Sequence, residues 1–169
     1  MTYGSLVPEV KDALVTVLQA RAGLASVQCS RRTPDNPADY VTSLGAGEAI
    51  WLGREGGQDV EIEGSPGPMI GGRLDPDEAF AVWLTVSVYR DDTEGTEQVT
   101  QNRAHTLLGE VLGTVFADPT LGVAAGNTSR SFKGVVAHGA FEFNERLKST
   151  GYWCRIEVRL DCIGRLTLT

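Results

Sequence analysis

The sequence of 169 residues is poor in the groups from which reactive sites are usually built. It contains two histidines and three cysteines, no Cys-x-x-Cys pair, and only 7% aromatic residues. The N-terminus has no basic segment followed by an apolar one, and no stretch approaches 18 consecutive apolar residues. We therefore expect neither export nor membrane spanning, and we interpret the chain as cytosolic in origin.

The few candidate reactive residues show no catalytic or metal-binding spacing. His105 and His138 have no second ligand at a spacing such as His-x-x-x-His, so we predict no metal, no cofactor and no catalytic residue. Cys154 and Cys162 would lie about 27 Å apart on one strand at ~3.3 Å per residue, too far for a disulfide, and with Cys29 they are interpreted as buried hydrophobic residues. A Cys–His pair that meets only in space stays open as an alternative.

Basic residues are in the minority, 15 against 22 acids, which gives a net charge of −7. A general nucleic-acid binder would carry a basic surface, so this class is disfavoured. The hydrophobic content of 41% and the charged content of 22% are those of an ordinary globular protein. One domain over residues 1–169 is expected, and the 20 glycines indicate many turns.

Apolar periodicity predicts two helices and several strands. A period near 3.6 indicates helices at Pro8 to Ala22 and Thr96 to Phe116. Alternation is strongest at Phe80 to Arg90, the expected central strand. The other predicted strands are Ala25 to Arg32, Ala49 to Leu52, Asp59 to Glu63, Phe132 to Phe143 and Tyr152 to Leu166.

Turn residues indicate how these strands connect. Gly56-Gly57 predicts a hairpin between the strands at Ala49 to Leu52 and Asp59 to Glu63. The polar segment Asn144 to Gly151 predicts a second, long hairpin at the C-terminal end. The proline-rich and glycine-rich stretches Thr33 to Pro37 and Gly64 to Asp77 are expected to be loops.

The expected fold class is α+β, with both helices packed on one face of a mostly antiparallel or mixed sheet and an extended C-terminal β-hairpin. The other sheet face would then meet water. Trp83 and Tyr89 are assigned to it, and large exposed aromatic residues are candidates for a partner surface.

The last strand carries the most informative charge pattern. Arg155, Glu157, Arg159 and Asp161 alternate in sign on one face, opposite an apolar face. Two interpretations stay open: the solvated face of an outer strand, or a self-complementary ladder at a subunit interface. The glycines of Leu44-Gly45-Ala46-Gly47 are interpreted as turn residues, since no phosphate-binding motif accompanies them.

The order of these elements resembles the tail terminator and tail completion (neck) proteins of long-tailed bacteriophages. The resemblance rests on the opening helix, on Ile50-Trp51-Leu52-Gly53, on the central strand Val82 to Tyr89, on the helix containing Arg103 to Leu112, and on Gly151 to Leu160. It covers most of the chain in order and spacing, without a single diagnostic motif.

The resemblance implies a structural virion protein without catalytic residues, assembled in the host bacterial cytoplasm and located in the tail or neck. It would form a homohexameric ring that ends the tail tube, bound to the tail tube protein and to a head-completion or head–tail connector protein. Genomic DNA would pass without specific binding, and no membrane is involved. The alternatives are a head–tail joining (head-closure or adaptor) component of the neck and, less favoured, a small ligand-binding domain or enzyme.

The candidate interface residues are Trp83, Arg155, Glu157, Arg159 and Asp161. Residues 48–79 hold eight acids against two bases, a local net charge of −6. If this segment lines or rims a channel, like-charge repulsion would keep DNA from adhering. The candidate rim residues are Glu55, Asp59, Glu61, Glu63, Asp75, Asp77 and Glu78.

Overall fold

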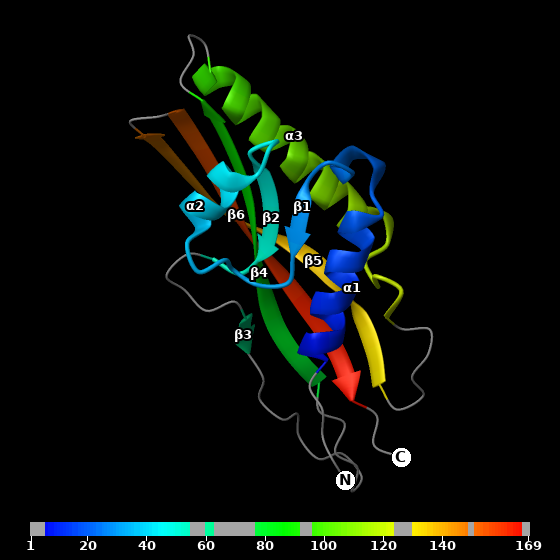
Figure 1. Cartoon of the computed structure of the whole chain (residues 1–169). Coiled ribbons are helices and arrows are strands. Elements are labelled where there is room, and N and C mark those ends of the chain that lie inside the picture. Colours follow the sequence, from blue (N-terminus) through cyan, green and yellow to red (C-terminus); the bar gives the residue numbers. More distant parts are fainter. Residues whose placement is uncertain are drawn as a thin grey trace, which may run out of the picture.

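The computed structural model describes residues 6–54, 60–62, 77–91, 96–123, 130–148 and 151–166. Helices lie against a strongly twisted sheet (Figure 1). The elements in chain order are α1 (Val7–Gln19), a short 3-10 helix η1 (Ala22–Leu24), β1 (Gln28–Ser30), α2 (Pro37–Ser43), β2 (Glu48–Leu52), β3 (Val60–Ile62), β4 (Asp77–Asp91), α3 (Thr96–Ala117), β5 (Arg130–Lys148) and β6 (Gly151–Leu166).

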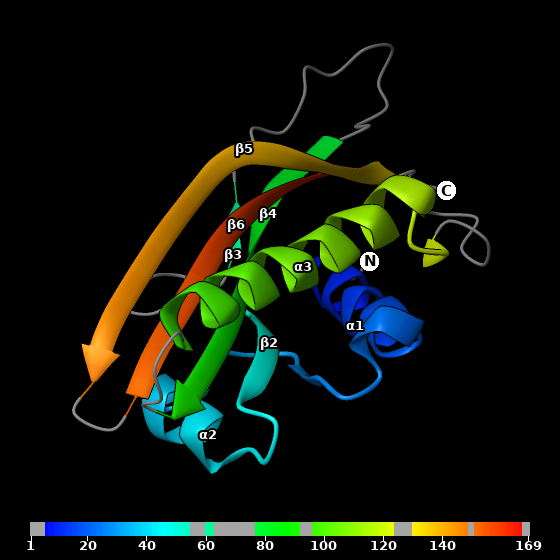
Figure 2. The same ribbon diagram turned by 90° about the horizontal axis from the view of Figure 1, so that it is seen from above.

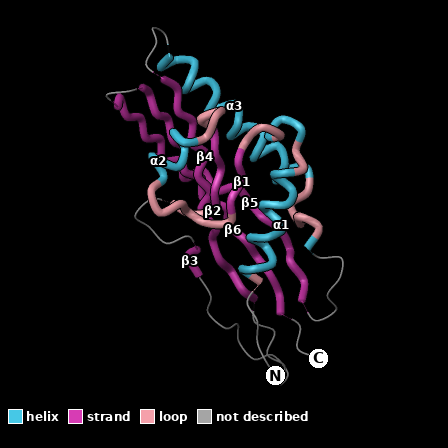
Figure 3. Tube along the Cα trace, in the orientation of Figure 1, coloured by secondary structure: helices cyan, strands magenta, loops and turns pink. Residues whose placement is uncertain are grey.

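The sheet is mixed, with strand order β1-β2-β4-β6-β5. β1 is parallel to β2, and the remaining pairs are antiparallel. The predicted hairpin between the second and third strands is wrong, because β2 pairs with residues 84–88 of β4 and β3 pairs with residues 80–82. The two short strands therefore follow one another along a single edge of β4 (Figure 3).

One face of the sheet packs against α1 and α3, which confirms the predicted α+β class. Seen from above, β4, β6 and β5 form a curved layer with both helices on its concave side (Figure 2). Alternate β4 and β6 residues form one buried apolar cluster with Leu14 of α1 and Leu107 and Val111 of α3. The alternation predicts this inner face, and β4 and α3 begin and end within a few residues of their predicted limits.

The sequence led us to expect that the opposite face would meet water, but a helix covers this face. Helix α2 packs there through Val41, against a second cluster that includes Trp51 and Tyr89. The sequence interpretation missed this helix, although Asn36 caps it by accepting a hydrogen bond from the Asp39 N–H, and a proline follows the cap. Tyr89 keeps 8% of its surface and Trp83 keeps 5%, so the expected exposure of both is wrong.

The C-terminal strands β5 and β6 pair antiparallel from Arg130↔Leu166 to Lys148↔Gly151. They extend further than predicted, since most of the polar segment expected to connect them lies within β5. Polar residues fit an outer strand because backbone pairing needs no apolar side chain. The ladder shifts register twice, between Phe132 and Gly134 and between His138 and Phe141, and is regular from there to its end.

Candidate functional site

All three tryptophans lie on the sheet face that carries α2. Trp51 and Trp153 belong to the cluster under this helix, and Trp83 shares their face by alternation along β4. The Trp153 indole N–H donates to the Ser87 hydroxyl at 2.5 Å. The guanidinium of Arg54 stands 4.6 Å from the centre of the Trp83 ring, a cation–π contact. Trp83 is thus packed within the chain and does not present an exposed anchor.

The charged residues of β6 pair along their own strand. Arg155 and Glu157 retain 8% and 3% exposure and form an ion pair of 3.5 Å, and Arg155 also stands over the Trp153 ring. Arg159 donates to Asp161 at 2.8 Å, with both side chains half-buried. A solvated face is therefore the wrong description for Arg155 and Glu157. Arg159 and Asp161 are the two members of the predicted ladder that reach solvent.

A buried carboxylate that the sequence interpretation did not single out ties the helix face of the sheet together. Glu48, 5% exposed at the start of β2, accepts two hydrogen bonds from Arg103 of α3, of 3.0 and 2.8 Å, and one from Arg90 of β4. Burial alone would raise the pKa of Glu48, but the hydrogen bonds from Arg103 and Arg90 outweigh it and hold this pKa below its ordinary value. The Glu48 carboxylate therefore connects β2 with β4 and α3.

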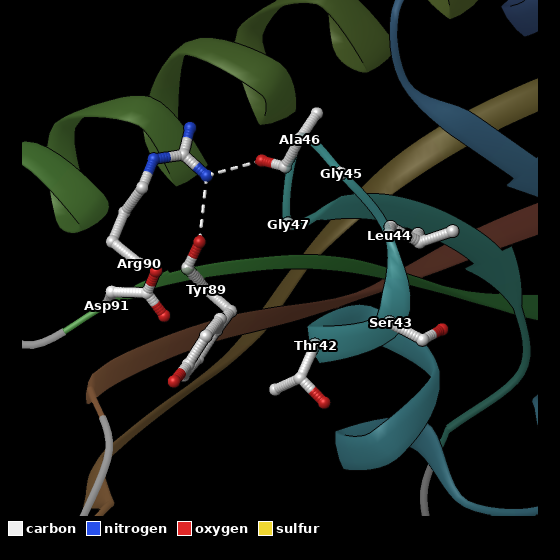
Figure 4. Close-up of a pocket in the computed structure, with 9 residues that line it drawn as sticks. All are labelled: Thr42, Ser43, Leu44, Gly45, Ala46, Gly47, Tyr89, Arg90 and Asp91. Atoms are coloured by element: carbon white, nitrogen blue, oxygen red, sulfur yellow. Dashed lines mark hydrogen bonds between the residues drawn. The ribbon is translucent and has the colours of Figure 1, made fainter.

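A pocket of about 310 Å³ lies beside this cluster, between the end of α2 and the end of β4 (Figure 4). The Arg90 guanidinium crosses it and donates to the carbonyls of Ala46 and Tyr89, at 2.7 and 2.8 Å. Gly47 has φ +59°, and a side chain there would overlap the Tyr89 carbonyl. Because the turn directs a carbonyl at a cation and follows a helix, it lacks the geometry of a phosphate-binding loop.

The cysteines are buried, and the two histidines lie on α3 and β5. All three cysteines are free and buried, as predicted, and burial raises the pKa of Cys29 to about 11 and that of Cys162 to about 12. His105 is exposed on α3, and His138 is the register partner of Arg159. Among the described residues, no three histidine, cysteine or acidic side chains gather as metal ligands.

The predicted acidic rim is placed only in part. Glu61 lies in β3 opposite Ala81, and Asp77 and Glu78 begin β4. The candidates outside the described residues are Glu55, Asp59, Glu63 and Asp75. Glu48, the first acid of the same segment, is neutralised by two arginines inside the chain. A channel role for the others stays a prediction.

Strand β5 lies at one end of the sheet. Within the ranges that the structure describes, β5 pairs only with β6, so one side of a 19-residue strand has no neighbouring strand. At the opposite end of the sheet, β1 forms a second outer edge. Backbone N–H and C=O groups along an outer strand can pair with another chain.

No protein-family model matches the chain, and no curated protein matches it. No helix in the described part of the chain combines the length and apolarity needed to cross a membrane.

Proposed function

We propose that this chain is the subunit of a ring, with six copies expected, that ends the tail tube of a long-tailed bacteriophage and joins it to the head-completion proteins. The observation that carries the proposal is the sheet itself. Its helices α1 and α3 cover one face, while its two ends are formed by different strands: β1, whose Cys29 carbonyl accepts from Gln19 of α1, and β5, which has no further neighbouring strand in the described residues.

Two different edges favour a ring over a closed pair. A contact between unlike surfaces repeats head to tail and closes into a ring when its rotation divides a full turn. The curvature of β4, β6 and β5 (Figure 2) supports a wall that bends rather than a flat array. The resemblance in element order supplies the phage context.

The proposal is tested by mass photometry of the purified chain, alone and with tail tubes. Six chains of 18.1 kDa give a particle of about 109 kDa, and negative-stain images should show it at one end of the tube. Particles bound to the head connector but not to tubes would favour the head–tail joining alternative. A chain that stays monomeric at micromolar concentration, with and without tubes, would refute the ring.

A further inference from the structure

Helix α2 lies against the sheet through the packing of its apolar side chains. Its side-chain hydroxyls donate only to carbonyls of the same helix. Within the described part of the chain, no hydrogen bond or ion pair joins residues 34–45 to the sheet, to α1 or to α3. Helix α3, by contrast, is connected to β2 by the ion pair of Arg103 with Glu48. The two sides of the sheet are therefore covered by helices that are held in different ways.

The packed part of α2 is small, and open space lies at both ends of the helix. Of its seven residues, only Pro37 and Val41 are buried. One pocket, of about 360 Å³, lies between Tyr40 and residues 30–35, and the pocket of about 310 Å³ lies at the other end of the helix (Figure 4). An isolated helix of this length is not stable in water, so α2 stays folded only while its packing holds.

The chain on either side of α2 is bound to the sheet. Before the helix, Ser30 pairs with Trp51 in the β1–β2 ladder. After the helix, Arg90 of β4 donates to the Ala46 carbonyl at 2.7 Å. Between these two points the chain can leave the sheet without breaking a strand pairing and without disturbing the contacts of Glu48 with its arginines.

We infer that α2 is a lid that opens and closes over the tryptophan cluster while the sheet, α1 and α3 stay folded. The surface beneath it includes Trp51, Tyr89 and Trp153, and tryptophan and tyrosine are enriched among the residues that dominate binding energy at protein interfaces. The Trp51 side chain is fully buried, and its indole N–H has no hydrogen-bond partner within the described residues. An unpaired buried donor destabilises the closed form relative to an open form in which water reaches it.

The lid would control access to this aromatic surface. A partner that binds the surface must select the open form, so its apparent affinity is reduced by the fraction of chains that are open. Changes that favour opening would therefore strengthen such binding. The lid does not depend on the proposed function, because every contact that defines it lies within one chain.

Hydrogen exchange of the full-length protein at low urea concentrations, followed by NMR, tests the lid. The amides of Tyr40 and Leu44, which donate to the carbonyls of Asn36 and Val41, should exchange at rates nearly independent of urea, because a local opening exposes little surface. Amides in the middle of α3 should exchange only when the whole chain unfolds, at rates that rise steeply with urea.

Three variants separate local opening from unfolding of the whole chain. Glu48→Gln weakens contacts that survive the opening of α2, so it should speed exchange in α3 about thirtyfold and change exchange in α2 less than twofold. Asn36→Ala removes the N-cap and should speed exchange of Tyr40 and Leu44 about fivefold. Asn102→Ala, the same substitution at an exposed position of α3, should leave α2 exchange unchanged. Equal acceleration of both helices by Glu48→Gln, or the same urea dependence for both helices, would overturn the lid.

Discussion

Replacing Glu48 with glutamine should destabilise the fold more than its single charge suggests. The variant keeps the size of the side chain and one acceptor oxygen but leaves Arg90 and Arg103 without their counterion. Removing one partner of a fully buried ion pair costs about 3–5 kcal/mol. Here the two arginine side chains are 30% and 32% exposed, so water replaces part of the lost contact. We expect a loss of about 2 kcal/mol, or about 4–8 °C in Tm for a chain of this length.

The assay is thermal and urea unfolding followed by circular dichroism, with Glu110→Gln as the matched control. Glu110 contacts Arg21 at 2.7 Å, but these side chains are 31% and 43% exposed, so its loss should cost less than about 1 kcal/mol. Equal melting temperatures for the two variants would refute the assignment of Glu48 as a buried tie between elements.

The pH dependence of the stability difference between the unaltered protein and Glu48→Gln tests the direction of the Glu48 pKa shift. The pKa of Glu48 is lower in the folded chain than in the unfolded one, where it is about 4.3. Its contribution is therefore complete above that unfolded value and is lost as pH falls through the folded pKa. The stability gap between the unaltered protein and Glu48→Gln should be largest near neutral pH and shrink below about pH 4. A gap of constant size from pH 7 to pH 3 would contradict this.

Three further changes probe other parts of the structure. Gly47→Ala should cost about 2 kcal/mol in urea unfolding, because the left-handed backbone and the Tyr89 carbonyl exclude a methyl group; an unchanged midpoint would contradict the turn geometry. Cys29 and Cys162 should resist a thiol reagent at pH 8 until urea unfolds the chain, given their raised pKa values, and rapid labelling of the native protein would argue against their burial. Arg159→Glu should weaken ring formation in mass photometry and leave the circular dichroism spectrum unchanged, whereas an unaffected ring would favour the solvated-face interpretation of this residue.

Elements with strong periodicity were predictable from sequence, and elements defined by distant partners were not. The alternation of β4 and β6 and the apolar stripe of α3 reflect burial on one side, which a local pattern records directly. β3 is three residues long and pairs with residues 80–82 of β4, which lie far from it in the sequence, so a neighbouring turn pair suggested the wrong pairing. Helix α2 has only seven residues, and its start at Asn36 and Pro37 resembles a turn.

The residues of the candidate site also divide into those that a local pattern identified and those that depend on distant partners. Arg159 and Asp161 were found by alternation, and the structure places them together at the surface of β6. Glu48 looked like one more acid in an acidic segment, because its partners Arg90 and Arg103 are 42 and 55 residues away. Burial of Arg155 and Glu157 was missed for a related reason, since a strand pattern separates two faces without saying what covers either of them.

The position of the tryptophans allows fluorescence to distinguish the α2 side of the sheet from the side covered by α1 and α3. Every indole of the chain, at residues 51, 83 and 153, lies on the α2 side of the sheet, and α1 and α3 contain none. Tryptophan fluorescence therefore reports on the α2 side of the sheet. A red shift of emission that precedes the loss of helical circular dichroism would mean that this layer opens first, and quenching by acrylamide before and after assembly would show whether a neighbouring subunit seals it.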